Sequence, residues 1–144
     1  MSQLEIIRSA LRRGAHDGVV VVTTNARDKI DAAFMRRFDA VVELGRPEAV
    51  RRRALLRKEL GTMGAELSDA FIADIAQRSD LSGGHIASMA RLARARARRA
   101  GRVSLSPTDV LYAVAFEHEK LGAGLAASRF REEADKAEES WARS

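Results

Sequence analysis

Three polar residues stand beside two apolar runs in the first third of the chain, and their side chains could contact a ligand. Asn25 directly follows the β-branched run 19–24, and the adjacent Arg36 and Arg37 come about ten residues later, just before the apolar run 40–44. A carboxamide at the end of a buried strand can reach a ligand, because open α/β sheets bind ligands outside the carboxyl ends of their strands. A guanidinium is a permanent planar cation that suits phosphate and carboxylate groups. The pattern therefore predicts a ligand site at one edge of a sheet.

The elements that must position these side chains belong to a short α/β segment. A continuous β-branched run such as 19–24 is typical of a strand buried on both faces inside a parallel sheet. Residues 30–37 are predicted to form a short helix, with Asp31 near its N-terminus, where the helix dipole favours a negative charge. Residues 40–44 have the pattern of a second short strand. We therefore expect residues 1–45 to be a piece of an α/β domain.

The remainder of the sequence reads as helix. Residues 46–121 form a pattern of four helices, in which Ser68 and Ser106 are predicted N-caps. The stretch 106–109 combines a cap, a proline in the first turn and an acidic residue three positions on. The helix that begins near residue 83 is predicted to bury one stripe, formed by Ile86, Met89, Ala90, Ala93 and Ala97. Residues 122–144 are expected to be a charged tail, helical in part and frayed at its end.

Composition sets limits on the class of protein. The 144 residues suit one medium domain, or a small domain with an appendage, and 46% apolar with 31% charged residues is ordinary for a soluble globular protein. The absence of cysteine excludes disulfides and thiolate metal sites. No apolar run approaches the ~20 residues that span a bilayer, and the first residues lack a signal-peptide pattern. We expect a cytoplasmic protein without a membrane partner.

Basic charge is concentrated in one short segment. The net charge is +5, and six arginines lie between Arg91 and Arg102. Such a patch can bind phosphates of nucleic acid or an acidic protein surface. The alternative is an ordinary solvated helix face, which we favour because no interleaved aromatic side chains offer a stacking surface.

The order of these features resembles the C-terminal half of the nucleotide-binding module of AAA+ ATPases, over about residues 5–122. Two sequence segments are similar to the family's sensor 1 strand and arginine-finger segment. They are Thr-Thr-Asn at 23–25 and Ile-Asp-Ala-Ala-Phe-Met-Arg-Arg-Phe-Asp at 30–39. Residues 83–86, Gly-Gly-His-Ile, are similar to the signature of the family's helical lid, and residues 106–120 to its closing helix. The resemblance implies an α/β fragment followed by an all-α lid.

The resemblance implies that the chain consists of three parts. Residues 1–45 would be the remnant, with two strands, of the parallel sheet of a P-loop NTPase. Residues 46–121 would be the four-helix lid, and residues 122–144 a tail outside it. The fold class expected is therefore mixed α/β at the start and mostly helical overall.

The same resemblance implies roles for the three polar residues. Asn25 would act as sensor 1 and orient the attacking water or the γ-phosphate of ATP. Arg36 and Arg37 would be arginine fingers that enter a neighbouring subunit's site and stabilise charge in the transition state. The family often places a Pro-Gly pair between its two arginines, and this sequence lacks it, so which arginine reaches the phosphate stays open. The alternatives are that Asn25 only turns the chain, and that the arginines pair with Asp31 or Asp39.

In the lid, the resemblance implies that Gly83, Gly84 and His85 contact the adenine or ribose of the nucleotide, because glycine lets the backbone approach a ligand closely. The alternative is a simple turn at the entry of a helix. Many AAA+ lids carry a sensor 2 arginine directly after the isoleucine of this motif. Ala87 stands there in this sequence, as in the AAA subgroup.

Two groups that an ATPase needs are missing from the sequence. There is no Gly-x-x-x-x-Gly-Lys-Ser/Thr, and no apolar strand ends in the Asp-Glu pair that holds Mg²⁺. ATP would therefore be the cofactor of a complete module, with Mg²⁺ ligands supplied from outside this chain, and we expect this chain alone to be inactive. The implied partners are further copies in a hexameric ring, or a polypeptide that carries the missing N-terminal half. A truncated gene product, half of a split ATPase and a degenerate relic would each explain the pattern, and we favour the first.

The function implied is that of a partial AAA+ ATPase, from an oligomeric motor that remodels proteins or assemblies. One alternative is a non-catalytic, basic helical module that binds nucleic acid or a protein partner through residues 91–102. A third is an adaptor that only donates Arg36 or Arg37 to a partner's ATPase site.

Overall fold

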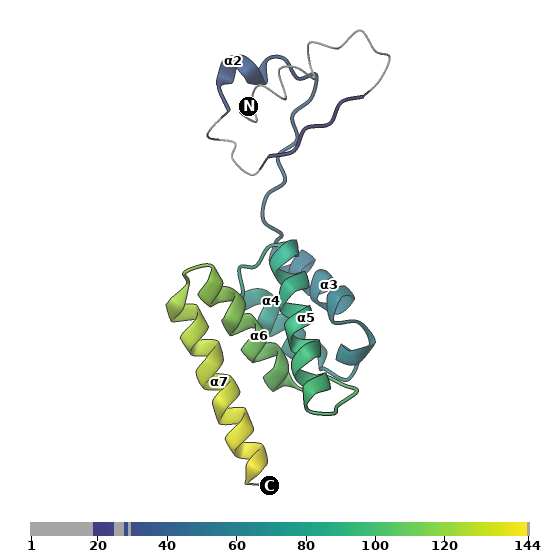
Figure 1. Cartoon of the computed structure of the whole chain (residues 1–144), viewed down its shortest axis with the longest axis vertical. Helices are drawn as coiled ribbons and strands as arrows, with labels where there is room; N and C mark the ends of the chain where they lie inside the picture. The colour runs from purple at the N-terminus through teal and green to yellow at the C-terminus, as the bar shows by residue number, and fades with distance from the viewer. Residues whose placement is uncertain (1–18, 25–27, 29, 144) are drawn as a thin grey trace. The chain divides into compact units, whose positions relative to one another are not determined.

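The structure, a computed structural model, describes residues 19–24, 28 and 30–143, which fall into two units, Met1–Glu43 and Leu44–Ser144. The regular elements of the described residues are helices, drawn in Figure 1. They are α2 (Ala32–Met35), α3 (Ala49–Leu60), the 3₁₀ helix η2 (Gly61–Gly64), α4 (Asp69–Arg78), α5 (Gly83–Arg99), α6 (Pro107–Lys120) and α7 (Gly124–Ala142). No helix in the described ranges is long and apolar enough to cross a membrane.

The two predicted strands are not formed. Residues 19–24 and 40–44 are irregular in the structure, and their apolar side chains face solvent, with Val19 92% and Leu44 90% exposed. A strand of this kind needs neighbours on both edges and cover on both faces, because otherwise its backbone groups stay unpaired and its side chains stay in water. No other apolar run of this sequence is predicted to be a strand that could lie between the two, and the run at 110–116 belongs to a helix. The expected sheet remnant is therefore absent from the described residues.

The helix predicted over 30–37 is shorter than expected. α2 has four residues, and Asp31 caps it by accepting a hydrogen bond from the backbone N–H of Ala33 at 3.0 Å. Phe34 is buried and packs edge-to-face against Phe38, with ring centroids 5.4 Å apart.

The second unit confirms the predicted caps. The Ser68 hydroxyl accepts a hydrogen bond from the backbone N–H of Phe71 at 3.1 Å, and Ser106 forms a capping box with Asp109 at the start of α6. These contacts satisfy N–H groups that have no partner within the helix.

A glycine follows the C-terminal end of α5 and another follows the C-terminal end of α6. Gly101 has φ +71° and Gly122 has φ +73°, a region that side chains with a Cβ rarely adopt. After α5, the N–H of Arg102 bonds the carbonyl of Ala97 at 2.9 Å; after α6, the N–H of Ala123 bonds the carbonyl of His118 at 2.9 Å. This is the Schellman arrangement, in which the chain reverses while the last carbonyls stay paired. It turns α6 back along α5 and α7 back along α6.

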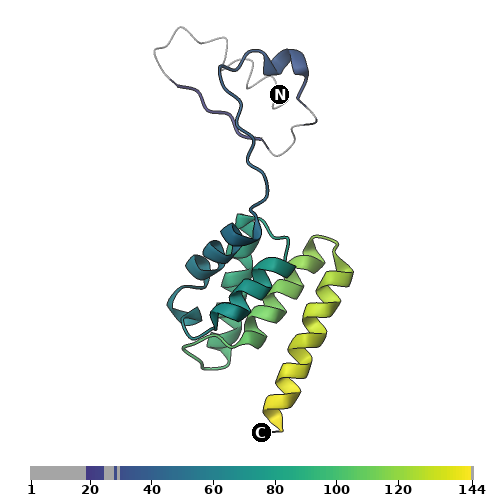
Figure 2. The ribbon, with the colours of Figure 1, turned by 180° about the vertical axis from the view of Figure 1, so that it is seen from behind.

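The core of the second unit lies between these helices. α6 packs against both α5 and α7, and α3 packs against α4 and α5, as Figures 1 and 2 show from opposite sides. The largest apolar side chains at its centre are Leu56, Leu60, Ile72, Ile75, Leu81, Ile86, Met89, Val110 and Val114. α7 adds Phe130 and Ala134 to the same core. The tail that follows residue 122 is thus a packed helix of the second unit.

Candidate functional site

The residues predicted to act on ATP lie in two separate units of the chain. Asn25 falls outside the described residues. Arg36 and Arg37 follow α2 with exposed side chains, and neither guanidinium has a hydrogen bond or ion pair in the described part of the chain. The alternative pairing with Asp31 or Asp39 is therefore not formed there, and Asp31 caps α2 instead.

Gly83, Gly84 and His85 form the first turn of α5. The Ser82 hydroxyl caps this helix, accepting from the backbone N–H of His85 at 3.5 Å and lying 2.6 Å from Nδ1 of the His85 ring. A Cβ added to Gly83 or Gly84 would meet its nearest atom only at 4.0 Å, which is ordinary contact, and neither glycine has a positive φ. Neither the packing nor the backbone therefore requires glycine at these positions.

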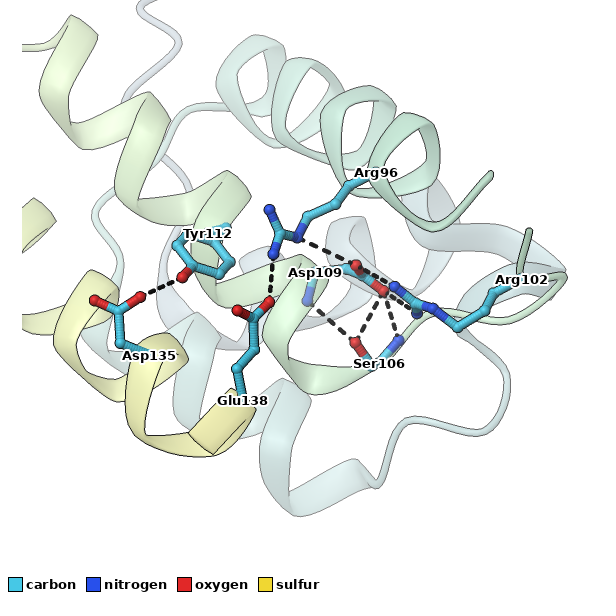
Figure 3. A network of polar contacts seen from close by, with 7 residues as sticks. All are labelled: Arg96, Arg102, Ser106, Asp109, Tyr112, Asp135 and Glu138. Atoms are coloured by element: carbon cyan, nitrogen blue, oxygen red, sulfur yellow. Dashed lines mark hydrogen bonds and ion pairs between the residues drawn. The ribbon is translucent and has the colours of Figure 1, made fainter. Parts of the chain in front are cut away.

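A polar network that we did not predict lies at the junction of α5 and α6. Asp109 is fully buried, and Arg102 donates to both of its carboxylate oxygens at 2.6 and 2.8 Å (Figure 3). The backbone N–H and the hydroxyl of Ser106 donate to the same carboxylate at 2.9 Å each. The Nε of Arg96, on α5, lies 3.5 Å from the carboxylate. The network joins α5, the turn after it and the first turn of α6.

The pKa values follow from this geometry. Burial acts to raise the pKa of Asp109, but hydrogen bonds from Arg102 and Ser106 outweigh it and hold the pKa below its usual value. The same contact with Asp109 raises the pKa of Arg102. Asp109 is therefore a carboxylate at neutral pH and has a structural role, since its charge is already matched.

α7 is attached to this region by polar contacts from its C-terminal half. The Tyr112 hydroxyl donates to Asp135, and Arg96 donates to Glu138 (Figure 3). The guanidinium carbon of Arg96 also lies 4.0 Å from the centroid of the Tyr112 ring. The hydrogen bond to Asp135, followed by burial, raises the pKa of Tyr112 to about 12. Arg96 thus bridges three helices.

A groove of about 700 Å³ opens beside this network, between α5, α6 and α7. α5 lines it with Leu92, Arg96 and Arg99, which are spaced four and three residues apart on one helix face. α6 lines it with Tyr112 and Phe116. Leu92 is 37% and Phe116 46% exposed, so the groove has an apolar floor that solvent reaches.

Three lining arginines already have acidic partners. Arg96 and Arg102 bind Asp109, and Arg131 of α7 pairs with Glu119 at 2.7 Å. Arg99 is exposed and has no partner in the residues that the structure describes. The groove therefore offers one uncommitted cation next to an apolar surface.

The arginine run predicts one basic face over residues 91–102, whereas in the structure Arg96 and Arg102 pair with the buried Asp109 and Arg99 faces solvent. The available signal was Asp109 in its cap motif, seven residues after Arg102. That spacing places an acid one loop away from the arginine run, although sequence alone does not show that the two side chains meet.

The chain is similar in part to a known protein. Over 74 residues it is 38% identical to spastin of Anopheles gambiae, a match that covers 51% of this chain and 9% of spastin. No protein-family model and no solved structure matches the chain. The partial match supports a relation to AAA ATPases, and the mostly helical structure is consistent with a helical lid.

Proposed function

We propose that this chain is the sensor 1, arginine-finger and lid portion of an AAA+ ATPase. In the complete module, ATP would bind with Mg²⁺ and be hydrolysed, and an oligomeric ring would use that energy to remodel proteins. The observation that carries the proposal is the 38% identity to spastin, an AAA ATPase, found for a sequence whose motifs follow the order of the family. Because spastin is matched over 9% of its length, its activity as a whole protein comes to this chain only as part of the proposal.

Arg36 and Arg37 suit the role of fingers that act in a neighbouring subunit. An arginine finger must be free to bind a phosphate that its own subunit does not hold. Both guanidinium groups are exposed and unpaired within the described ranges, so no internal contact has to be broken. Asn25 would contribute the sensor 1 amide, beside the γ-phosphate of its own subunit.

The glycines at the start of α5 support a nucleotide contact there. Glycine in a helix costs about 0.5–1 kcal/mol relative to alanine, so its presence without a structural need requires another reason. The fold leaves room for a Cβ at both Gly83 and Gly84. Close approach of adenine or ribose to the backbone would be such a reason, with His85 beside it.

The exposed runs around residues 19–24 and 40–44 support completion by another segment. Val19, Val21, Val42 and Leu44 are each at least 79% exposed, and such side chains cost free energy in water. In the complete module these runs would become strands on either side of the P-loop strand. The sheet would then bury the side chains that are exposed here.

The test is to complete the module and measure ATP turnover. A segment with a P-loop and an Asp-Glu strand would be fused before residue 1, taken from the adjoining reading frame or from Anopheles spastin. We expect the fusion to hydrolyse ATP, and Asn25→Ala and Arg37→Ala to lower turnover by about 10³-fold with a much smaller change in nucleotide affinity. Arg36→Ala tests which arginine is the finger. Arg51→Ala is the matched control, since Arg51 is an exposed arginine of α3 without a partner among the described residues.

The proposal fails if Asn25→Ala and both finger variants turn over ATP like the parent fusion. An adaptor role would give a different result: the unfused chain would stimulate a separate ATPase, and Arg36→Ala or Arg37→Ala would abolish that stimulation.

A further inference from the structure

The groove between α5, α6 and α7 has properties that the ATPase roles do not use. Its volume of about 700 Å³ falls within the ~300–1,000 Å³ typical of pockets that seat a ligand. Leu92 and Phe116 present apolar surface to solvent at its floor. None of the predicted sensor, finger or lid-glycine residues lines it.

The charge around the floor is predominantly positive. Four arginines line the groove, at positions 96, 99, 102 and 131, against the single acidic side chain of Glu138. Arg96 and Arg102 share the buried Asp109, which reduces their charge as seen from the groove. Arg99 has no such partner within the described residues, and it stands on the same face of α5 as Leu92. An occupant should therefore join an acidic group to an apolar one.

A protein segment fits these features better than a nucleic acid does. Nucleic-acid surfaces use several free cations for phosphates and open aromatic faces for bases. Here Arg96 lies over the Tyr112 ring, and the Tyr112 hydroxyl is bonded to Asp135. Of the two lining aromatic side chains, Phe116 alone, at 46% exposure, is therefore open to a base. Glu138 and Asp135 would repel a phosphate backbone that passed along α7. The remaining apolar floor does not bind phosphates, but it suits the anchor residues of an amphipathic helix.

We propose that the groove binds an acidic amphipathic helix of a partner protein, with apolar anchors on Leu92 and Phe116 and a carboxylate on Arg99. The apolar anchors would supply most of the affinity, and the ion pair would select the acidic partner. This inference does not depend on the ATPase proposal, because it uses only the contacts of the second unit.

The test is a binding assay with the full 144-residue chain and a designed probe. The probe is a fluorescein-labelled helical peptide with Leu and Phe four positions apart and Glu at its other surface positions. Three comparison ligands are used: the same peptide with Lys in place of Glu, an acidic peptide without the apolar residues, and a fluorescein-labelled duplex DNA. Fluorescence anisotropy gives each dissociation constant.

Two substitutions in the groove have matched controls outside it. Arg99→Glu is paired with Arg91→Glu, since Arg91 is an exposed arginine of the same helix that has no partner in the part of the chain that the structure describes and does not line the groove. Phe116→Ala is paired with Leu125→Ala, an exposed apolar residue of α7 outside the lining. We expect Arg99→Glu and Phe116→Ala each to weaken binding of the probe by about tenfold or more, and both controls to leave it within about twofold. Circular dichroism checks that each variant stays folded.

The comparison ligands also test the proposal on the unmodified chain. The proposal predicts that the acidic amphipathic probe binds more tightly than all three of them. It is overturned if the acidic peptide without apolar residues binds equally well, if the DNA binds more tightly, or if the probe shows no saturable binding in the millimolar range. It is also overturned if Arg91→Glu weakens binding as much as Arg99→Glu, because the whole basic face of α5 would then be the binding surface.

Discussion

Arg102 binds both carboxylate oxygens of the fully buried Asp109, and the pair closes the turn that leads from α5 into α6. Gly101 places Arg102 at this point by taking the left-handed conformation, with the N–H of Arg102 bonded to Ala97. The carboxylate in turn completes the capping box with Ser106. One acidic side chain therefore sets both the start of α6 and the path of the preceding turn.

The first prediction concerns the stability that this pair provides. Arg102→Gln should lower the free energy of unfolding by about 2 kcal/mol, because it leaves a buried carboxylate with Ser106 and the more distant Arg96 as partners. Arg99→Gln, which removes an exposed arginine without a partner in the described residues, should change it by less than about 0.5 kcal/mol. Urea unfolding followed by circular dichroism measures both. Equal effects of the two substitutions would mean that the Arg102–Asp109 pair has no net stabilising value.

The second prediction concerns acid unfolding. The pKa of Asp109 is lower in the folded chain than in the unfolded chain, so the unfolded state binds the proton more readily. The stabilisation by Asp109 should be fully present above about pH 4, near the carboxyl's unfolded value, and should be lost as the pH falls through the lower folded value. Asp109→Asn should therefore be less stable than the parent at pH 7 and should lose less stability between neutral and acid pH.

The control for that comparison is Glu132→Gln, an exposed residue of α7 without a partner in the described residues. It should keep the parent's pH dependence. If Asp109→Asn also keeps it, other carboxylates account for the acid sensitivity.

The third prediction concerns the docking of α7. Tyr112 is the single tyrosine of the chain, so tyrosinate absorbance reports its ionisation alone. We expect it to titrate near pH 12, about two units above the usual value, because ionisation would place a negative charge beside Asp135. Asp135→Asn should lower the pKa towards 10, and Glu132→Gln should not. A parent that titrates near 10 while circular dichroism shows a folded chain would mean that α7 does not hold Tyr112 in solution.

The fourth prediction separates a structural from a functional role of the lid glycines. Gly83→Ala and Gly84→Ala should leave the stability of the chain unchanged or raise it by up to about 1 kcal/mol, since both positions are helical and have room for a Cβ. Gly64→Ala should destabilise the chain, because its Cβ would lie 2.7 Å from the Cβ of Leu60. In the completed ATPase, Gly83→Ala or Gly84→Ala should weaken nucleotide binding. Unchanged nucleotide affinity in both would leave these glycines without the proposed role.

Local sequence was not sufficient to predict whether the two strands form. The run at 19–22 has strong β-branched character, yet no strand forms in it, because strand pairing depends on neighbours that this sequence does not contain. The helix predicted over residues 30–37 forms only at Ala32–Met35.

The sequence by itself determined the four helices within residues 46–121 and the starts of those that have a serine cap. Ser68, Ser106 and the stripe from Ile86 to Ala97 could be recognised because a cap or a helical stripe depends only on residues within a few positions of one another. Only the tertiary structure decided which arginines of α5 are paired, and that Arg99 lines the groove without a partner in the described residues. That division arises where α5, α6 and α7 meet, because charges distant in sequence interact only after the two glycine-ended turns bring their helices side by side.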